Sequence, residues 1–208
     1  MRDDKSFDKF LELPVKMRER AFQVDTVVGK QGDFKSILTI HFPVYELQLM
    51  LLLDEHTCEN IVGLLDWIEG IIGTGEIARL FGIILTDRGI EFCDYKAIEK
   101  SSIEHTQRCR VFYCDPMRSN QKGSCEKNHT FIRRILPKKT SFENLTQEDV
   151  SLMCSHINSY PRKSIGGISP IAACSKFIPK KLLDELGIKH IRSDEVALKP
   201  SLLDKKII

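Results

Sequence analysis

The sequence of 208 residues has no long apolar run, no internal repeat and no paired cysteine motif. Its longest apolar stretch, around Leu47 to Leu53, is too short to cross a bilayer, which takes about 20 apolar residues. The seven cysteines are an odd number without a Cys-x-x-Cys pair, so no disulfide framework is indicated. The first residues are charged, unlike a signal peptide. We therefore expect a cytoplasmic protein with reduced thiols and no membrane partner.

The charge is distributed unevenly along a composition that is otherwise ordinary for a globular protein. Hydrophobic residues make up 42% and charged residues 29%, which suits one packed domain with a modest extension. Residues 1–117 hold 14 Lys/Arg and 20 Asp/Glu, whereas 118–208 hold 17 and 9. An acidic half beside a basic half suits a metal-dependent enzyme acting on a polyanion. A solvated lysine-rich tail would give the same counts.

Hydrophobic periodicity predicts an α/β protein with five strands and three principal helices. The predicted strands are Phe22–Val28, Ser36–Phe42, Leu47–Leu53, Ile83–Thr86 and Arg110–Cys114. The predicted helices are Cys58–Ile71 with Thr57 or Asp54 as its cap, Ser124–Leu136, and Gln147–Ser159 capped by Thr146. Short connections make the first three strands an antiparallel meander, and strands after a helix can add in parallel. We thus expect a mixed five-stranded sheet flanked by helices, with Trp67 in the core.

The same pattern suggests three parts along the chain. Residues 1–20 are polar and charged and are expected to form a lead-in segment. Residues 21–175 hold the predicted sheet and its helices and are expected to form the core domain. Residues 176–208 are expected to form a C-terminal helical extension, because they contain Lys- and Leu-rich helical sequence after Pro179.

Three acidic residues in different settings suggest one metal site. Asp25 lies inside an apolar strand, Asp87 ends another strand, and Glu126 stands on the first turns of a basic helix. A carboxylate among β-branched residues is costly to bury unless a positive charge compensates it. Each has a plainer interpretation alone: a turn aspartate for Asp87, an outward-facing strand residue for Asp25. Together they predict a Mg²⁺ site, with Mn²⁺ as a possible substitute, and phosphodiester chemistry on nucleic acid.

The helix that carries Glu126 is rich in positive charge. Residues 118–139 contain seven Lys/Arg and one acidic residue. We expect the DNA backbone to be held by four of these cations, namely Lys122, Lys127, Arg133 and Arg134. An ordinary amphipathic helix with its apolar face buried gives the same pattern. His129, one turn after Glu126, could act as a donor or proton carrier near the site, or lie on the surface.

A zinc site is the main rival interpretation of this region. Cys109, Cys114, Cys125 and His129 fall within 21 residues. Cys109 and Cys114 are five apart on a predicted strand, so they should point to opposite faces of the sheet. The spacing also lacks the Cys-x₂₋₄-Cys knuckle of structural zinc sites. Cys125 shows no obvious activating histidine, and we expect the cysteines to be small core residues.

Several segments, in order, carry a family resemblance. They include Val24-Asp25-Thr26-Val27-Val28-Gly29, Leu85-Thr86-Asp87-Arg88-Gly89, Gln121-Lys122-Gly123-Ser124-Cys125-Glu126 and Leu136-Pro137-Lys138. Through them the chain resembles bacterial insertion-sequence transposases of the IS-thirty type, within the DDE integrase-core superfamily. The resemblance implies a ribonuclease-H-like integrase core and a two-metal site in which Asp25, Asp87 and Glu126 match the three catalytic acids. It also implies double-stranded DNA as substrate, phosphodiester hydrolysis with strand transfer, and a homo-oligomer on DNA.

The chain departs from this family pattern in two places. Arg88 stands beside Asp87 where the family usually has asparagine, and we expect its guanidinium to pair with the Asp87 carboxylate and compete with Mg²⁺ for its oxygens. The alternative is that Arg88 points outward to a DNA phosphate and assists. The roughly 20 residues before the first strand are too few for a helix-turn-helix domain. We therefore expect a transposase catalytic core that lacks its N-terminal DNA-binding domain. The alternative is a catalytically inactive remnant that binds DNA or oligomerises without cutting.

Overall fold

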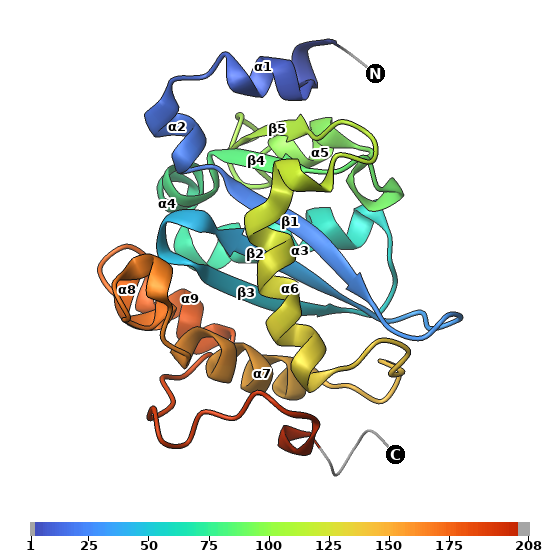
Figure 1. Cartoon of the computed structure of the whole chain (residues 1–208). Coiled ribbons are helices and arrows are strands. Elements are labelled where there is room, and N and C mark those ends of the chain that lie inside the picture. Colours follow the sequence, from blue (N-terminus) through green and yellow to red (C-terminus); the bar gives the residue numbers. More distant parts are fainter. Residues whose placement is uncertain (1–2, 204–208) are drawn as a thin grey trace.

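A mixed five-stranded sheet forms the centre of the computed structural model, which describes residues 3–203 (Figure 1). The strands are β1 (Phe22–Val28), β2 (Ser36–Phe42), β3 (Leu47–Leu53), β4 (Ile83–Thr86) and β5 (Arg110–Tyr113). Their order across the sheet is β3-β2-β1-β4-β5. β1, β2 and β3 pair antiparallel, whereas β4 pairs parallel to both β1 and β5. The predicted fold class, a mixed sheet that begins with a meander, is confirmed.

The register between β1 and β4 positions two of the predicted acids. Gln23 on β1 pairs with Leu85 on β4. Asp25 and Asp87 are each two residues further along these parallel neighbours, so both backbones reach the same level of the sheet. On the other side of β1, Asp25 is opposite Thr39 of β2. The middle of β1 is therefore where the sheet can bring polar groups from three strands together.

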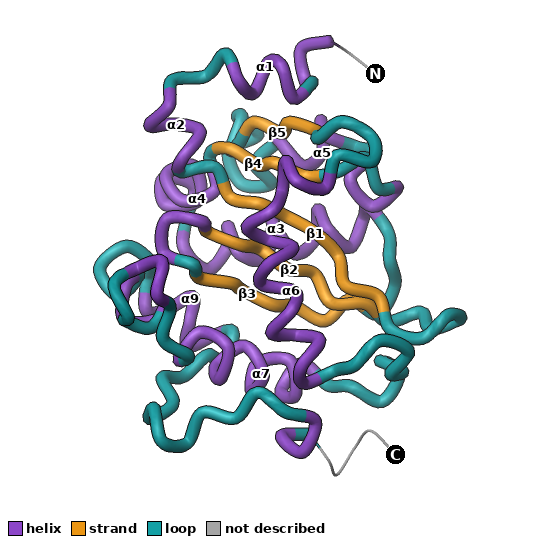
Figure 2. Tube along the Cα trace, in the orientation of Figure 1, coloured by secondary structure: helices purple, strands orange, loops and turns teal. Residues whose placement is uncertain are grey.

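Helices cover both faces of the sheet (Figure 2). α6 (Gly123–Ile135) crosses one face over β1 and β2, and α3 (Cys58–Ile72) lies behind the other. α7 (Gln147–Ser159) packs against β3 at the edge. The remaining helices are α1 (Phe7–Leu11), α2 (Val15–Glu19), α4 (Thr74–Phe81), α5 (Tyr95–Glu99), α8 (Pro170–Ala173) and α9 (Lys180–Glu185). Two apolar clusters result, and the smaller one joins Phe10 of α1 to Phe112 of β5.

The predicted helix boundaries are nearly correct, and Trp67 is the clear error. Thr57 caps α3 through its hydroxyl, and Thr146 caps α7 in a reciprocal capping box with Asp149. Trp67, expected in the core, is 41% exposed. The buried stripe of α3 contains Ile61, Leu65 and Ile68, and Trp67 lies to the side of that stripe.

Both ends of the described chain contribute to packing around the sheet. Phe10 is buried in the smaller cluster, and Leu182 of α9, Leu186 and Leu203 are buried in the larger one. Residues 204–208 of the predicted extension lie outside the described residues. Within residues 3–203, no helix is both long and apolar enough to span a membrane.

Candidate active site

Asp25 and Asp87 converge on a single cation, the ammonium group of Lys122. Lys122 Nζ lies 3.2 Å from Asp25 Oδ2 and 2.9 Å from Asp87 Oδ2. The other oxygen of each carboxylate is held by the backbone: Asp25 Oδ1 accepts from Thr26 N at 2.9 Å, and Asp87 Oδ1 accepts from Gly89 N at 3.0 Å. In each aspartate, one carboxylate oxygen is held by a backbone N–H and the other faces the ammonium group of Lys122.

Lys122 is a buried internal cation rather than an exposed one. It is the last residue of the short 3-10 helix Ser119–Lys122 that leads into α6, and it is only 3% exposed. Burial lowers the pKa of its ammonium, but Asp25 and Asp87 outweigh burial and the net pKa is raised. Lys122 therefore stays charged at neutral pH. We expected Lys122 to face the DNA backbone, and the structure places it between the two aspartates instead.

Glu126 stands one helical turn after Lys122. It is half-buried, and its carboxylate makes no hydrogen bond or ion pair with the described residues. Residues three or four positions apart lie on the same side of an α-helix. The Glu126 side chain is therefore on the same side as those of Lys122 and His129. Glu126 is accordingly an uncommitted carboxylate on the helix that directly follows Lys122, the cation between Asp25 and Asp87.

The Arg88 side chain does not take the position expected from the sequence. Arg88 is exposed and makes no ion pair with Asp87 among the described residues. The turn is organised by Gly89 N, and the cation at Asp87 comes from Lys122, 35 residues further along the chain. The prediction that the Arg88 guanidinium pairs with Asp87 is therefore wrong.

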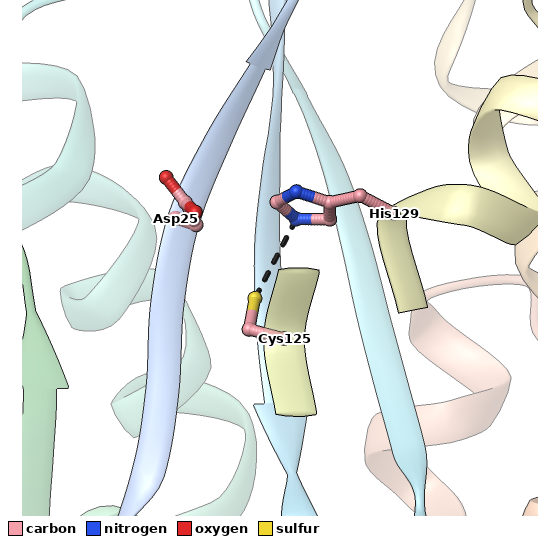
Figure 3. Close-up of side chains that lie close together, drawn as sticks. All are labelled: Asp25, Cys125 and His129. Atoms are coloured by element: carbon pink, nitrogen blue, oxygen red, sulfur yellow. Dashed lines mark hydrogen bonds between the residues drawn. The ribbon is translucent and has the colours of Figure 1, made fainter. Parts of the chain in front are cut away.

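Cys125 and His129 lie on the side of α6 that faces β1 and β2 (Figure 3). His129 Nε2 is 3.5 Å from Cys125 Sγ and 2.9 Å from Thr39 Oγ1. Burial raises the pKa of the Cys125 thiol to about 12 and lowers the pKa of His129, so both are neutral at pH 7. The sequence analysis grouped Cys125 and His129 only within a four-residue zinc set and found no histidine partner for Cys125, although a spacing of four residues on a helix is the signal for this pair.

A second buried carboxylate stabilises the loop after β4. Glu91 Oε1 accepts a hydrogen bond from Thr26 Oγ1 at 2.7 Å and lies 2.7 Å from His56 Nε2. Thr26 directly follows Asp25, so Glu91 ties the loop that follows Asp87 to the strand that carries Asp25. The sequence analysis assigned no role to Glu91 or His56.

The other three predicted DNA-binding cations differ in their surroundings. Lys127 and Arg134 are exposed, and the Arg134 guanidinium lies 5.1 Å from the centre of the Phe131 ring. Arg133 is half-buried, and its Nη2 donates to Val28 O at 2.9 Å. Only Lys127 and Arg134 of the four are therefore freely exposed.

The expected arrangement of Cys109 and Cys114 is confirmed. Cys109 is buried in the larger apolar cluster and Cys114 in the smaller one, on opposite faces of the sheet. The two thiols therefore cannot share one ion with Cys125 and His129. All seven cysteines are free thiols in the structure.

Sequence comparison finds relatives among transposases and a viral integrase, although no family model matches the chain. The chain is 32% identical over 79 residues to the transposase InsI of insertion sequence IS30A from Escherichia coli (strain K12), covering 38% of this chain and 19% of that protein. It is 23% identical over 158 residues to the transposase of IS4351 from Bacteroides fragilis, covering 75% and 45%. It is 31% identical over 148 residues to a putative integrase of Spiroplasma virus SpV1-R8A2 B, covering 71% and 43%.

Among solved structures, the catalytic core domain of BIV integrase aligns with a TM-score of 0.47 and 16% identity. The alignment covers 74% of this chain and 92% of that domain.

The sequence relatives of this chain are thus transposases of insertion sequences and a putative viral integrase. Among these relatives are the transposases of the insertion sequences IS30 and IS4351, which confirms the resemblance found in the sequence. The matched region spans less than half the length of these relatives.

Proposed function

We propose that this chain is the catalytic core of a DDE-type DNA transposase, with Asp25, Asp87 and Glu126 as its catalytic acids. It would hydrolyse a phosphodiester at the element end and join the freed 3′ hydroxyl to target DNA. The observation that carries this proposal is the convergence of Asp25 Oδ2 and Asp87 Oδ2 on one buried cation, at 3.2 and 2.9 Å. The uncommitted carboxylate of Glu126, one turn along α6, supplies the third acid.

The donor set suits a hard divalent cation. Carboxylate oxygens are the protein ligands that Mg²⁺ prefers, and Lys122 Nζ shows that this position already holds a positive charge. Asp25, Asp87 and Glu126 would hold Mg²⁺, or Mn²⁺ in its place, once the Lys122 ammonium moves away. The metal would supply activation of the attacking hydroxyl and charge stabilisation at the leaving oxygen.

The surrounding residues hold the two aspartates in place. Thr26 N and Gly89 N each fix one oxygen, so the free oxygens of Asp25 and Asp87 keep their direction without a bound ion. Glu91 joins the loop that follows Asp87 to the strand that carries Asp25. Such preorganisation lowers the cost of assembling the site when substrate arrives.

Double-stranded DNA is the proposed substrate, at the element ends and at the target, with the chain acting as a homo-oligomer. Lys127 and Arg134 are exposed on α6 and would contact the phosphate backbone. Arg133 would contribute from its half-buried position at the end of β1, beside Val28.

Metal-dependent cleavage by the full chain tests this function. Supercoiled plasmid should be nicked with Mg²⁺ or Mn²⁺ and not with chelator, and an oligonucleotide with a 3′ hydroxyl end should be joined to plasmid. Asp25→Asn, Asp87→Asn and Glu126→Gln should each abolish both products. Asp184→Asn is the matched control, because Asp184 pairs with Lys180 on the exposed face of α9. Cleavage that survives the first three substitutions would contradict the assignment.

One observation favours the alternative of an inactive DNA-binding or oligomerising remnant. Lys122 neutralises both aspartates from a buried position, so a metal ion must displace a well-paired ammonium. If Lys122 stays, the chain would bind DNA in a salt-dependent manner and cut nothing. Absence of nicking with either metal, together with DNA binding by the same preparation, would favour this alternative.

A further inference from the structure

Cys125, His129 and Asp25 form a second cluster of metal-ligating side chains, in which Asp25 is the only member that also contacts Lys122 (Figure 3). Cys125 and His129 come from successive turns of α6, and Asp25 comes from β1. One ligand atom of each residue, the thiol sulfur, a ring nitrogen and a carboxylate oxygen, lies within 4.8 Å of the other two. The ligand atoms of two elements far apart in sequence are therefore gathered at one place.

The spacing of Cys125 and His129 matches one edge of a tetrahedral zinc site. Zinc bonds of about 2.3 Å to sulfur and about 2.0–2.1 Å to nitrogen, at a tetrahedral angle, separate the two ligand atoms by about 3.5 Å. Cys125 Sγ and His129 Nε2 are 3.5 Å apart. Thiolate and imidazole also select zinc-like ions over Mg²⁺, which prefers oxygen ligands.

We propose that Cys125, His129 and Asp25 bind Zn²⁺ at a site distinct from the Mg²⁺ site, and that Asp25 serves only one of the two ions at a time. Three protein ligands leave a fourth position for water. Binding changes no oxidation state. The Cys125 thiol releases its proton to solvent and the thiolate bonds to zinc, while His129 bonds through Nε2 and carries its proton on Nδ1. Thr39 Oγ1, which now lies 2.9 Å from His129 Nε2, keeps its hydrogen bond to Asp25 O.

The surroundings of the cluster favour zinc binding at His129 and oppose it at Cys125. The pKa of His129 is lowered by burial, which keeps its ring nitrogen available as a ligand, whereas burial raises the pKa of Cys125 to about 12 and makes its deprotonation costly. The positive charges of Lys122 and Arg133 also act on His129 and oppose a second cation. A bound zinc ion would also compete with Lys122 for the Asp25 carboxylate.

Zinc binding does not depend on the proposed transposase activity, but its consequence does. With Asp25 coordinated to zinc, one of the three proposed catalytic acids is withdrawn from the Mg²⁺ site. Zn²⁺ would then inhibit Mg²⁺-supported cleavage.

Direct metal titration tests the site without DNA. The full chain, freed of metal by a chelator, is titrated with Zn²⁺ by calorimetry and with Co²⁺ by absorption, where thiolate coordination gives a charge-transfer band. We expect one high-affinity ion per chain. Cys125→Ser and His129→Gln should each weaken zinc binding by at least about tenfold, and Cys125→Ser should remove the band. Cys93→Ser and His105→Gln are the controls, because both residues are exposed.

Two outcomes would overturn the site: no stoichiometric binding of either ion to the folded parent chain, or an unchanged cobalt band in Cys125→Ser. Circular dichroism verifies that each variant is folded, and Cys125→Ala serves if the serine variant is not. Where the parent nicks plasmid, Zn²⁺ should inhibit the parent and spare Cys125→Ser. A parent that binds zinc without nicking speaks against the transposase proposal and leaves the zinc site standing.

Discussion

Replacing Lys122 by methionine removes the buried cation while keeping most of its volume. The two carboxylates that now share it would face each other without compensation. We expect Lys122→Met to be less stable than the parent in the absence of divalent metal and to regain stability when Mg²⁺ is added. The parent should respond to Mg²⁺ much less, because Lys122 competes for the same oxygens.

The magnitude follows from the two contacts and their exposure. At about 3 Å and an effective dielectric constant near 20, each ion pair has a Coulomb energy of about 5 kcal/mol before desolvation. Burial of Lys122 offsets much of this, and the Asp87 side chain is 47% exposed, so solvent screens its pair. We expect a net loss of about 2–3 kcal/mol, or roughly 4–10 °C in Tm for a chain of this size. Relief of competition worth about 1.4 kcal/mol would tighten apparent Mg²⁺ binding about tenfold.

Thermal unfolding with and without Mg²⁺ measures both the stability lost in Lys122→Met and the stability regained when Mg²⁺ binds. The pKa of Lys122 is raised above 10.5, so its contribution is complete below pH 10.5 and is lost as pH rises through the folded-state value. Measurements at pH 7–8 therefore include the full contribution of the Lys122 ammonium to stability. Lys180→Met is the matched control, because Lys180 pairs with Asp184 at 2.6 Å with its side chain 85% exposed, and its loss should cost at most about 0.5 kcal/mol. Equal Mg²⁺ responses of the parent and Lys122→Met would refute the competition between lysine and metal.

Three further predictions concern stability and DNA binding. Arg108→Met should cost about 3–5 kcal/mol in urea unfolding, because it leaves the fully buried Glu69 carboxylate without its cation. Lys127→Ala and Arg134→Ala should each reduce the slope of log K for DNA binding against log salt by about one. The pKa of buried His41 is lowered to about 3 because burial disfavours its charged form, so the unfolded chain binds one more proton below pH 6.5 and stability falls. His41→Asn should remove about 2 kcal/mol of the stability difference between pH 7 and pH 5.

Each of these predictions has its own control. Arg79→Met removes an exposed pair with Glu76 and should destabilise the chain much less than Arg108→Met, so equal losses in the two variants would contradict the buried-pair argument. An unchanged salt slope in Arg134→Ala would show that this face of α6 does not meet DNA. An identical pH dependence in the parent and His41→Asn would show that His41 is not the titrating group.

The sequence alone determined the sheet and two of the site's residues. β1, β2 and β3 begin and end where predicted, because apolar runs and their Gly- or Pro-containing breaks are local signals. Asp25 and Asp87 could be selected because an acid inside or at the end of an apolar strand is costly without a partner. The threonine caps of α3 and α7 could also be predicted from the sequence, because each capping residue directly precedes its helix.

The tertiary structure alone decided which cation meets these acids. Lys122 was predicted to face DNA and Arg88 to pair with Asp87, but β-strand register and the entry into α6 bring Lys122 to both aspartates. The contact depends on the packing of elements 35 and more residues apart, which no local pattern encodes. The meeting of Asp25 with Cys125 and His129 has the same origin, since side chains separated by 100 residues become neighbours only when α6 packs across β1.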